Sequence, residues 1–351
     1  MYRKLSHLLF SLCALYGASA QAAVILQYHH VSKTLPKVTS VEADTFRAHL
    51  QYLQQHEFKV VALDTLLNGL QQGQAFDDKT VAITFDDGYD NNIEQAAPIL
   101  AEFGYPYTIF VNPALIDEQK GYVMTWAELK ELSKQGALIA NHSSRHDYLH
   151  HRLEGESEEQ WRSRIKADLT HAEKRIEEEI GYSLKYLAYP YGEFDKALQE
   201  VVKELGYTGI GQHSGAMGPG NDFTRLPRFP ASGFYADLDT LATKLESLPF
   251  ALANIDYSDT VTAELRPMVT LEFAEKGFHN KQFACYVSGQ GQAEIKWLDG
   301  KRVTVQAKQD LKPGRARYNC TAPSLHKSGR YLWFSQPWVI TQDETNRGNS
   351  Q

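Results

Sequence analysis

The sequence predicts an α/β fold, a distorted (β/α)7-type barrel followed by a small all-β sandwich domain. Between residue 23 and about residue 245, short apolar or β-branched runs alternate with amphipathic stretches, as in repeated βα units around a parallel sheet. After about residue 250 the helical spacing disappears, and strand-like runs follow one another between Gly or Pro turns. The 351 residues, 42% hydrophobic and 23% charged, suit one large domain with a smaller companion and exclude a disordered or collagen-like chain.

Seven apolar or β-branched runs are expected to form the strands of the barrel. They are residues 24–27, 59–62, 80–85, 107–111, 137–140, 186–189 and 208–210. The clearest helix between them begins after Ser157, which forms a capping-box pattern with Gln160, and ends at Gly181. Its apolar positions recur at helical spacing and predict one buried stripe: Trp161, Ile165, Leu169, Ala172, Ile176 and Ile180.

The C-terminal part of the chain has the pattern of a β-sandwich. Its expected strands are residues 260–265, 268–273, 282–287, 293–297, 302–307 and 331–334. Trp297, Trp333 and Trp338 lie there and either form core or bind glycan. Cys285 and Cys320 are a disulfide candidate in an exported protein, and a bridge closing this 36-residue loop would add roughly 3 to 4 kcal/mol. Two buried free thiols are the alternative.

The N-terminal segment has the pattern of a secretory signal peptide. Arg3 and Lys4 precede an apolar run that ends in small residues, and no other stretch is apolar enough for a transmembrane segment. We therefore expect an exported protein, periplasmic or secreted. Loss of this leader would remove two positive charges and change the net charge from −7 to −9, which argues against nucleic acid as a partner. The expected organisation is a signal peptide at 1–22, a barrel domain at 23–250 and a β-sandwich accessory domain at 256–341.

Two adjacent carboxylates follow the most apolar of the predicted barrel strands. Asp86 and Asp87 come directly after residues 80–85 and are followed by Gly88. Barrel active sites are built at the carboxyl ends of the strands, and adjacent side chains on an extended backbone point in different directions. One aspartate can therefore bind a metal while the other faces a substrate, although Asp-Asp-Gly by itself is also a common turn.

Two histidines follow a second predicted strand. His142 and His146 lie four residues apart just after residues 137–140, a spacing that lets both rings converge on one ion. By itself, such a pair is often only solvent-exposed and binds no metal. Coupled to the aspartates at a neighbouring strand end, two His and one carboxylate form a metal-binding set with positions left for water and substrate.

Two further segments lie at predicted strand ends. Tyr189, Pro190 and Tyr191 precede a glycine and either wall a groove or form a simple turn. His29 and His30 follow the first predicted strand and would place an imidazole over the same face, or serve only as structural histidines.

In this order, the four segments resemble the motifs of the polysaccharide deacetylases, the NodB-homology family of carbohydrate esterases. The matched segments are Thr-Phe-Asp-Asp-Gly, His-Ser-x-x-His and an aromatic-Pro-Tyr-Gly stretch, within roughly residues 24 to 230. The resemblance implies that Asp87, His142 and His146 bind the metal. It also implies that Asp86 is the general base and that Tyr191 contributes a backbone donor to the oxyanion site.

The sequence departs from the commoner family pattern in two places. That pattern has an arginine two residues before the proline of the third motif, where this chain has Ala188, and Arg228 is our candidate to hold Asp86 instead. The late Leu-x-His motif that supplies the acid is also absent from its expected position. The segment from Tyr28 to Val31 resembles the PgaB/IcaB-like deacetylases of poly-β-1,6-N-acetylglucosamine, in which an N-terminal histidine is the acid. By that resemblance the acid is His29, with His30 as the fallback.

The resemblance implies a hydrolase of carbon–nitrogen bonds other than peptide bonds, an exported metal-dependent N-deacetylase of an N-acetylglucosamine polysaccharide such as a biofilm exopolysaccharide. Its partners would be that polysaccharide and exopolysaccharide or cell-envelope assembly proteins. Its cofactor would be one divalent metal ion, zinc first, with nickel, cobalt or iron as alternatives. The alternative substrates are peptidoglycan, chitin oligomers or O-acetyl xylan. The alternative of a different class is a catalytically inactive glycan-binding or scaffold protein.

Overall fold

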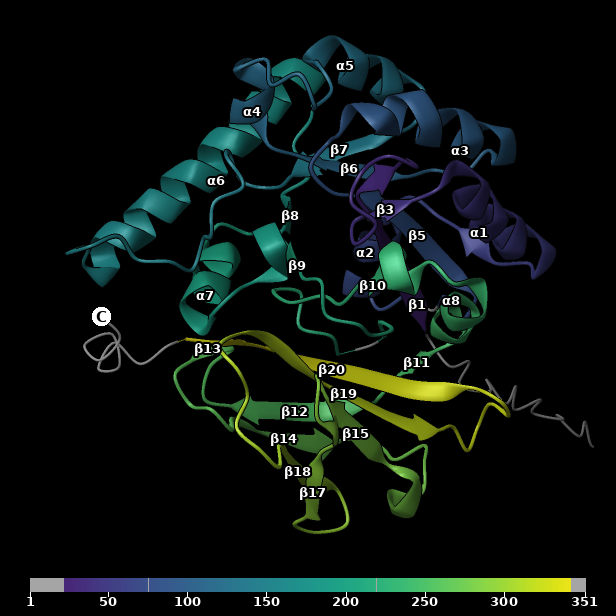
Figure 1. Cartoon of the computed structure of the whole chain (residues 1–351), viewed down its shortest axis with the longest axis vertical. Helices are drawn as coiled ribbons and strands as arrows, with labels where there is room; N and C mark the ends of the chain where they lie inside the picture. The colour runs from purple at the N-terminus through teal and green to yellow at the C-terminus, as the bar shows by residue number, and fades with distance from the viewer. Residues whose placement is uncertain (1–21, 75, 219, 342–351) are drawn as a thin grey trace, which may run out of the picture.

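The computed structural model describes residues 22–74, 76–218 and 220–341. A parallel α/β barrel forms one part of the molecule, and an all-β region packs against one end of it (Figure 1). The expected signal peptide lies outside the described residues, apart from Ala22. Among the described residues, none of the helices is both long enough and apolar enough to span a membrane.

The barrel is built on one parallel sheet in the order β10-β1-β5-β6-β7-β8-β9, and β4 pairs with the start of β5. The strands are β1 (Ala23–Tyr28), β4 (Lys59–Val60), β5 (Thr80–Phe85), β6 (Thr108–Val111), β7 (Leu138–Asn141), β8 (Tyr186–Ala188), β9 (Thr208–Ile210) and β10 (Phe229–Pro230). All seven expected strands are present, within one or two residues at their ends, and the predicted fold class is confirmed. The sequence pattern missed β10, because two residues are too few to show a period.

Helices surround this sheet (Figure 1); most pack on its outer face, whereas the helix Leu63–Gln71 packs with the inward-facing residues Ile25, Ala82 and Phe110. They are α1 (Ala43–Gln55), α2 (Leu63–Gln71), α3 (Ala97–Phe103), α4 (Pro113–Asp117), α5 (Trp126–Lys134), α6 (Glu158–Ile180), α7 (Lys196–Glu204) and α8 (Leu238–Leu245). The prediction for α6 is confirmed, since Ser157 and Gln160 form the capping box and Gly181 ends the helix with a left-handed φ of 95°. Its predicted stripe is buried from Trp161 to Ile176.

The all-β region consists of a six-stranded and a four-stranded sheet. The first has the order β11-β20-β19-β15-β16, with β13 paired to β20, and the second has the order β12-β14-β18-β17. Their strands are β11 (Leu248–Pro249), β12 (Leu252–Tyr257), β13 (Val261–Thr262), β14 (Met268–Phe273), β15 (Ala284–Val287), β16 (Gly291–Gln292), β17 (Glu294–Trp297), β18 (Arg302–Gln306), β19 (Gly314–Pro323) and β20 (Tyr331–Ile340). The predicted disulfide is confirmed, because Cys285 on β15 is bonded to Cys320, its direct neighbour on β19.

Several expectations for this region were wrong. The strand expected at 331–334 continues to Ile340 as β20, and the two-residue strands β11 and β16 were not expected. The strand expected at 260–265 is only Val261–Thr262, because the chain turns there and the Glu264 amide donates to the Thr262 hydroxyl. The expected list also lacked β12, in which no residue is buried, and β19, whose buried alternation begins only at Tyr318 after an Arg-rich start. Neither strand presents the apolar run on which the prediction relied.

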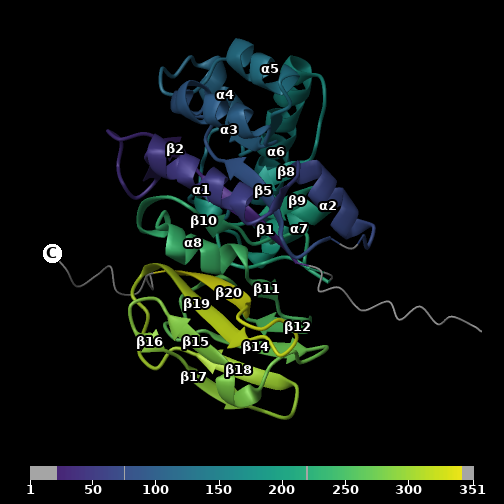
Figure 2. The ribbon, with the colours of Figure 1, turned by 90° about the vertical axis from the view of Figure 1, so that its right-hand side faces the viewer.

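The barrel and the all-β region meet along β20 (Figure 2). The ring of Trp333 on β20 packs edge-to-face on Phe229 of β10, with 5.3 Å between the ring centroids. Arg330, just before β20, pairs with Asp78 of the barrel, and Arg225 donates to Gln336 at 3.0 Å. Apolar, ionic and hydrogen-bonded contacts therefore all hold the two parts together.

Candidate metal centre and active site

The pairing of β1 with β5 brings two of the motifs together. The strands are parallel and in register over their whole length, so that Tyr28 lies opposite Phe85. His29 therefore follows the end of β1 and Asp86 follows the end of β5. The backbone amide of Asp86 donates to the Tyr28 carbonyl oxygen at 3.0 Å. His29 Nε2 lies 3.9 Å from Asp86 Oδ2.

The backbone turns sharply between the two aspartates and points their carboxylates in different directions. Asp87 has a left-handed φ of 70°, and Gly88 follows with a φ of 62°. A left-handed conformation is costly for a residue with a side chain, and such residues concentrate at functional sites. Asp86 consequently points to the interior, where it is fully buried, while Asp87 is partly exposed.

Asp87, His142 and His146 form a three-residue cluster with the composition of a metal site. Asp87 Oδ1 lies 3.4 Å from His142 Nε2 and 3.3 Å from His146 Nε2, and one ligand atom of each residue lies within 4.8 Å of the others. The other ring nitrogen of His142, Nδ1, is 2.7 Å from the carbonyl oxygen of Ala188, the kind of contact that fixes the orientation of a metal-ligating imidazole. His142 Nε2 is buried and finds no hydrogen-bond partner among the described residues. A cation would satisfy it, so these residues fit a divalent metal ion.

A strained loop after β7 presents the two histidines. Ser143 and His146 both have left-handed φ values, 66° and 63°. Asn112 donates to the Ser143 carbonyl oxygen at 3.2 Å, and Asp168 accepts from the Ser144 amide at 3.1 Å. These side chains of neighbouring elements hold the loop in a conformation that its own residues disfavour.

Charges and burial set the protonation of this cluster. Burial raises the pKa of Asp87, but the adjacent His142 and the other nearby imidazoles outweigh this effect and hold that pKa well below its usual range. Burial and the neighbouring His142 lower the pKa of His146 to about 4. An ionised carboxylate and a neutral imidazole are the forms that bind metal ions.

The Asp86 carboxylate is held by a buried arginine. Arg228 Nη1 donates to Asp86 Oδ1 at 2.7 Å and Nη2 donates to Oδ2 at 2.8 Å, while Gln27 donates to Oδ2 at 2.7 Å. Arg228 is fully buried, and its Nε donates to the Gly211 carbonyl oxygen at 2.9 Å. Burial would raise the pKa of Asp86, but the positive charges of Arg228 and His142 lower it to about 2. The structure thus pairs Arg228 with Asp86, although the two residues are 142 positions apart.

The remaining predicted site residues lie at different depths. Tyr191, in a short turn after β8, has a left-handed φ of 60° and packs against His146 with 4.4 Å between the ring centroids. Pro190 is buried at the start of that turn. Tyr189 is fully buried, and its hydroxyl donates to the Thr224 carbonyl oxygen at 2.7 Å. The structure therefore brings Tyr191 to the metal cluster, whereas the Tyr189 side chain lies in the apolar cluster formed with α6 and α7.

The two histidines after β1 have different surroundings. The His30 ring stacks on Tyr89, with 3.7 Å between the ring centroids, and its Nδ1 lies 3.0 Å from the side-chain Nδ2 of Asn91. His29 instead lies beside Asp86. Burial lowers the pKa of His29, and Asp86 and Asp87 partly offset this effect.

Three residues of the site were missing from the sequence prediction. Gln27 shares Asp86 with Arg228, Asn112 holds the histidine loop, and Tyr148 stacks on Tyr191 at 4.0 Å between the ring centroids. Gln27 and Asn112 are polar residues at the ends of buried strands, and a polar residue at such a position could have marked them as site residues. No comparable signal distinguishes Tyr148 from other loop tyrosines.

The fold and site geometry agree with the comparisons to known proteins. Residues 73–210 match the family model described as Polysaccharide deacetylase. For this part of the chain the resemblance inferred from the motifs is confirmed as a match to a polysaccharide deacetylase domain. This family is one of hydrolases.

Two curated relatives are informative. Over 229 residues the chain is 27% identical to the poly-β-1,6-N-acetyl-D-glucosamine N-deacetylase of Staphylococcus aureus, a match that covers 59% of this chain and 78% of the relative. Over 183 residues it is 26% identical to YxkH of Bacillus subtilis, a protein named for the same family, and this match covers 52% of the chain. The match spans 61% of the length of YxkH.

Solved structures show the same fold. The deacetylase PplD of Streptococcus pyogenes, in complex with acetate, superposes with a TM-score of 0.57 at 19% identity, covering 64% of this chain and 98% of PplD. IcaB from Ammonifex degensii also gives a TM-score of 0.57, at 20% identity, covering 65% of this chain and 98% of IcaB.

Proposed function

We propose that this chain is an exported, metal-dependent deacetylase that hydrolyses the N-acetyl groups of an N-acetylglucosamine polysaccharide. The observation that carries the proposal is the convergence of Asp87, His142 and His146, with Asp86 and His29 beside them at the same end of the barrel. The similarity to a relative named as a poly-β-1,6-N-acetyl-D-glucosamine N-deacetylase supports this glycan as the substrate. The signal-peptide pattern of residues 1–22 supports export.

Asp87, His142 and His146 would hold one divalent cation. Two imidazoles and a carboxylate suit zinc, and they also accept nickel, cobalt or iron. Such an ion, when bound, supplies Lewis-acid chemistry that makes water a better nucleophile at neutral pH and polarises an acyl oxygen. The three ligands leave the remaining positions to solvent and substrate.

Asp86 is the proposed general base. Its carboxylate accepts the proton of the water that attacks the acetamide carbon, and its Oδ2 faces His29 across 3.9 Å. Arg228 and Gln27 fix the carboxylate in one orientation, so that no reorientation is needed during the reaction. Arg228 is thus a positioning residue that acts through Asp86.

His29 is the proposed general acid, which gives a proton to the leaving amine nitrogen as the carbon–nitrogen bond breaks. The products are acetate and a glucosamine unit. The position of His29 beside Asp86 favours it over His30, whose ring is stacked on Tyr89 and whose Nδ1 faces Asn91. The backbone amide of Tyr191 is the proposed donor to the oxyanion, and the stacked rings of Tyr148 and Tyr191 wall the site beside His146.

Paired aspartate variants test this division of labour. We expect Asp86→Asn to lose at least 100-fold in acetate release while retaining one metal ion per chain, because Asp86 pairs with Arg228. Asp87→Asn should lose both activity and metal, because Asp87 faces both histidines. Metal content by elemental mass spectrometry and acetate release from N-acetylglucosamine oligomers measure the two effects. Equal metal loss in both variants would contradict the assignment.

A further inference from the structure

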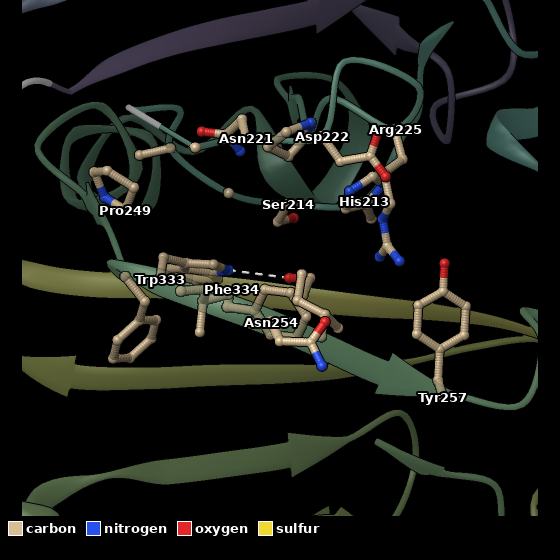
Figure 3. A pocket seen from close by; sticks show the side chains of 18 of the residues that line it. His213, Ser214, Asn221, Asp222, Arg225, Pro249, Asn254, Tyr257, Trp333 and Phe334 are labelled. Carbon is tan, nitrogen blue, oxygen red and sulfur yellow. Dashed lines mark hydrogen bonds between the residues drawn. The ribbon is translucent and has the colours of Figure 1, made fainter. Parts of the chain in front are cut away.

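A cleft of about 330 Å3 lies between the barrel and the all-β region, away from the metal cluster. One wall comes from the segment after β9, including Ser214 and Ala216, and the other from β12 and β20 (Figure 3). Met217 exchanges backbone hydrogen bonds with Ala23, the first residue of β1. This part of the cleft therefore lies at the amino end of β1. Asp86 and Asp87 lie at the carboxyl end of the parallel strand β5, which is the opposite end of the barrel.

One wall of this cleft carries aromatic side chains, and the opposite wall carries polar ones, including Asn221, Asp222 and Arg225 (Figure 3). Figure 3 shows Trp333, Phe334 and Tyr257 on one wall, with Asn254 beside them. The Trp333 indole is half-buried, and its Nε1 donates to the Ser335 hydroxyl at 3.2 Å, which fixes the ring at the cleft. Fixed aromatic surfaces with a few oriented polar groups are typical of small-ligand sites, and domain interfaces are a common location for them.

The polar groups of the cleft are incompletely paired. Arg225 is only 5% exposed, and its Nη2 donates to the Gln336 side-chain oxygen at 3.0 Å. Its Nη1 has no hydrogen-bond partner within the part of the chain that the structure describes. Figure 3 shows the guanidinium group directed toward Tyr257. Because an unpaired buried donor costs free energy, an oxygen of a bound ligand near this group would be stabilising.

The charges of the cleft disfavour a cationic ligand. Arg225 and Lys196 contribute two positive charges and Asp222 one negative charge. The Asp222 carboxylate is already engaged, since its Oδ1 accepts from the Thr224 amide at 2.8 Å and from the Thr224 hydroxyl at 2.7 Å. The net positive lining would repel a sugar whose amine is free and protonated, but it would not repel a neutral acetamido sugar.

We propose that this cleft is a second saccharide site, which binds one neutral N-acetylated sugar unit of the polysaccharide. The identity of the ligand rests on the proposed function. The volume is near the lower end of the roughly 300 to 1,000 Å3 found for ligand sites, which suits one unit of a longer chain. Together with the metal site, such a cleft would hold the polysaccharide at two points, and two weak sites on one polymer bind more tightly than either alone. Because the cleft prefers acetylated units, the polysaccharide would be held only while acetylated units remain.

The NMR signal of the Trp333 indole N–H gives a readout confined to the cleft. The titration uses N-acetylglucosamine trimer and Asp86→Asn protein, which prevents hydrolysis, and the signal is assigned by its loss in Trp333→Phe. We expect a saturable shift of the Trp333 signal and none of Trp161, a fully buried residue of α6. Glucosamine trimer should bind at least 10-fold more weakly. No shift, or equal binding of the two trimers, would overturn the proposal.

Variants of an exposed cleft residue complete the test. Asn254→Trp fills the cleft and should weaken trimer binding at least 10-fold, and the milder Asn254→Ala should weaken it about 3-fold. Ser258→Trp adds the same bulk to an exposed position that does not line the cleft, and it should leave binding unchanged. Unchanged binding in both Asn254 variants would place the ligand elsewhere and overturn the proposal.

Acetate release by unmodified protein, measured in parallel, separates this proposal from the proposed function. Release without a Trp333 shift overturns the cleft site alone. A Trp333 shift without release overturns the deacetylase activity and leaves the cleft site supported.

Discussion

Replacing Arg228 by methionine would leave the Asp86 carboxylate buried without its cationic partner. Arg228 makes two hydrogen bonds to Asp86, at 2.7 and 2.8 Å, and both side chains are fully buried. Removing one partner of such a pair costs about 3 to 5 kcal/mol, because a charge is left in a low-dielectric interior. We expect the free energy of unfolding of Arg228→Met to fall by about this amount, toward the lower end because Gln27 still donates to Asp86.

A double-mutant cycle isolates the pair itself. Asp86→Asn removes the charge that Arg228 neutralises, so the double variant should lose less stability than the sum of the single variants, by about 2 kcal/mol. Urea unfolding with chelator present, followed by circular dichroism, measures all four proteins. Arg302→Met is the control, because Arg302 pairs with Asp299 at the surface and should contribute about 0 to 1 kcal/mol.

Activity adds an independent readout of the positioning role. Arg228→Lys keeps the charge but not the two-pronged contact, and kcat should fall about 10- to 100-fold while KM and metal content change little. A stability loss under 1 kcal/mol in Arg228→Met, or additive effects in the cycle, would refute the reasoning about the buried pair. Unchanged kcat in Arg228→Lys would refute the positioning role.

Three further predictions concern the metal cluster, the disulfide and a buried lysine. His146→Ala should lose at least 10-fold in metal affinity by equilibrium dialysis, whereas affinity equal to the parent would remove His146 from the ligand set. Replacing Cys285 and Cys320 together by serine should lower the free energy of unfolding by about 3 to 4 kcal/mol, as should reduction of the parent protein, and no change would show that the bridge does not stabilise the fold. Burial and the nearby Arg317 lower the pKa of Lys244 to about 8, so its charge destabilises the folded state fully below pH 8 and not above about pH 10.5. Lys244→Met should therefore stabilise the protein by about 3 kcal/mol at pH 7 and by much less at pH 10.5 in urea unfolding. Lys203→Met, at an exposed position, should leave stability unchanged at both pH values. A gain in Lys244→Met that is independent of pH would contradict the buried charge as its cause.

The parts of the site that the sequence predicted are those carried by short contiguous segments. Asp86 and Asp87 follow the six-residue strand β5, and His142 and His146 follow the four-residue strand β7, so their position at strand ends could be inferred locally. Parallel pairing then brings such ends to one edge of the sheet. The divergence of Asp86 from Asp87 was also expected, although it depends on the left-handed turn at Asp87 rather than on extended backbone.

The parts that the sequence did not predict depend on distant partners or on exposed strands. Gln27 and Asp86 are 59 positions apart, and their contact depends on the register of β1 against β5, which no local pattern specifies. Arg228 was proposed only because the usual arginine position holds Ala188. The strand β19 was missed because its first half is arginine-rich and largely exposed, and the cleft against β12 and β20 exists only once the two parts of the chain pack together.

The most direct test of the proposed function is acetate release by the purified protein from N-acetylglucosamine oligomers, β-1,6-linked and β-1,4-linked in parallel. We expect release from the β-1,6-linked set, loss of that release with chelator, and recovery on addition of zinc or another divalent metal ion. Preference for the β-1,4-linked set would move the substrate to chitin or peptidoglycan. Absence of release from both sets by metal-loaded, folded protein would contradict the proposed N-deacetylase activity.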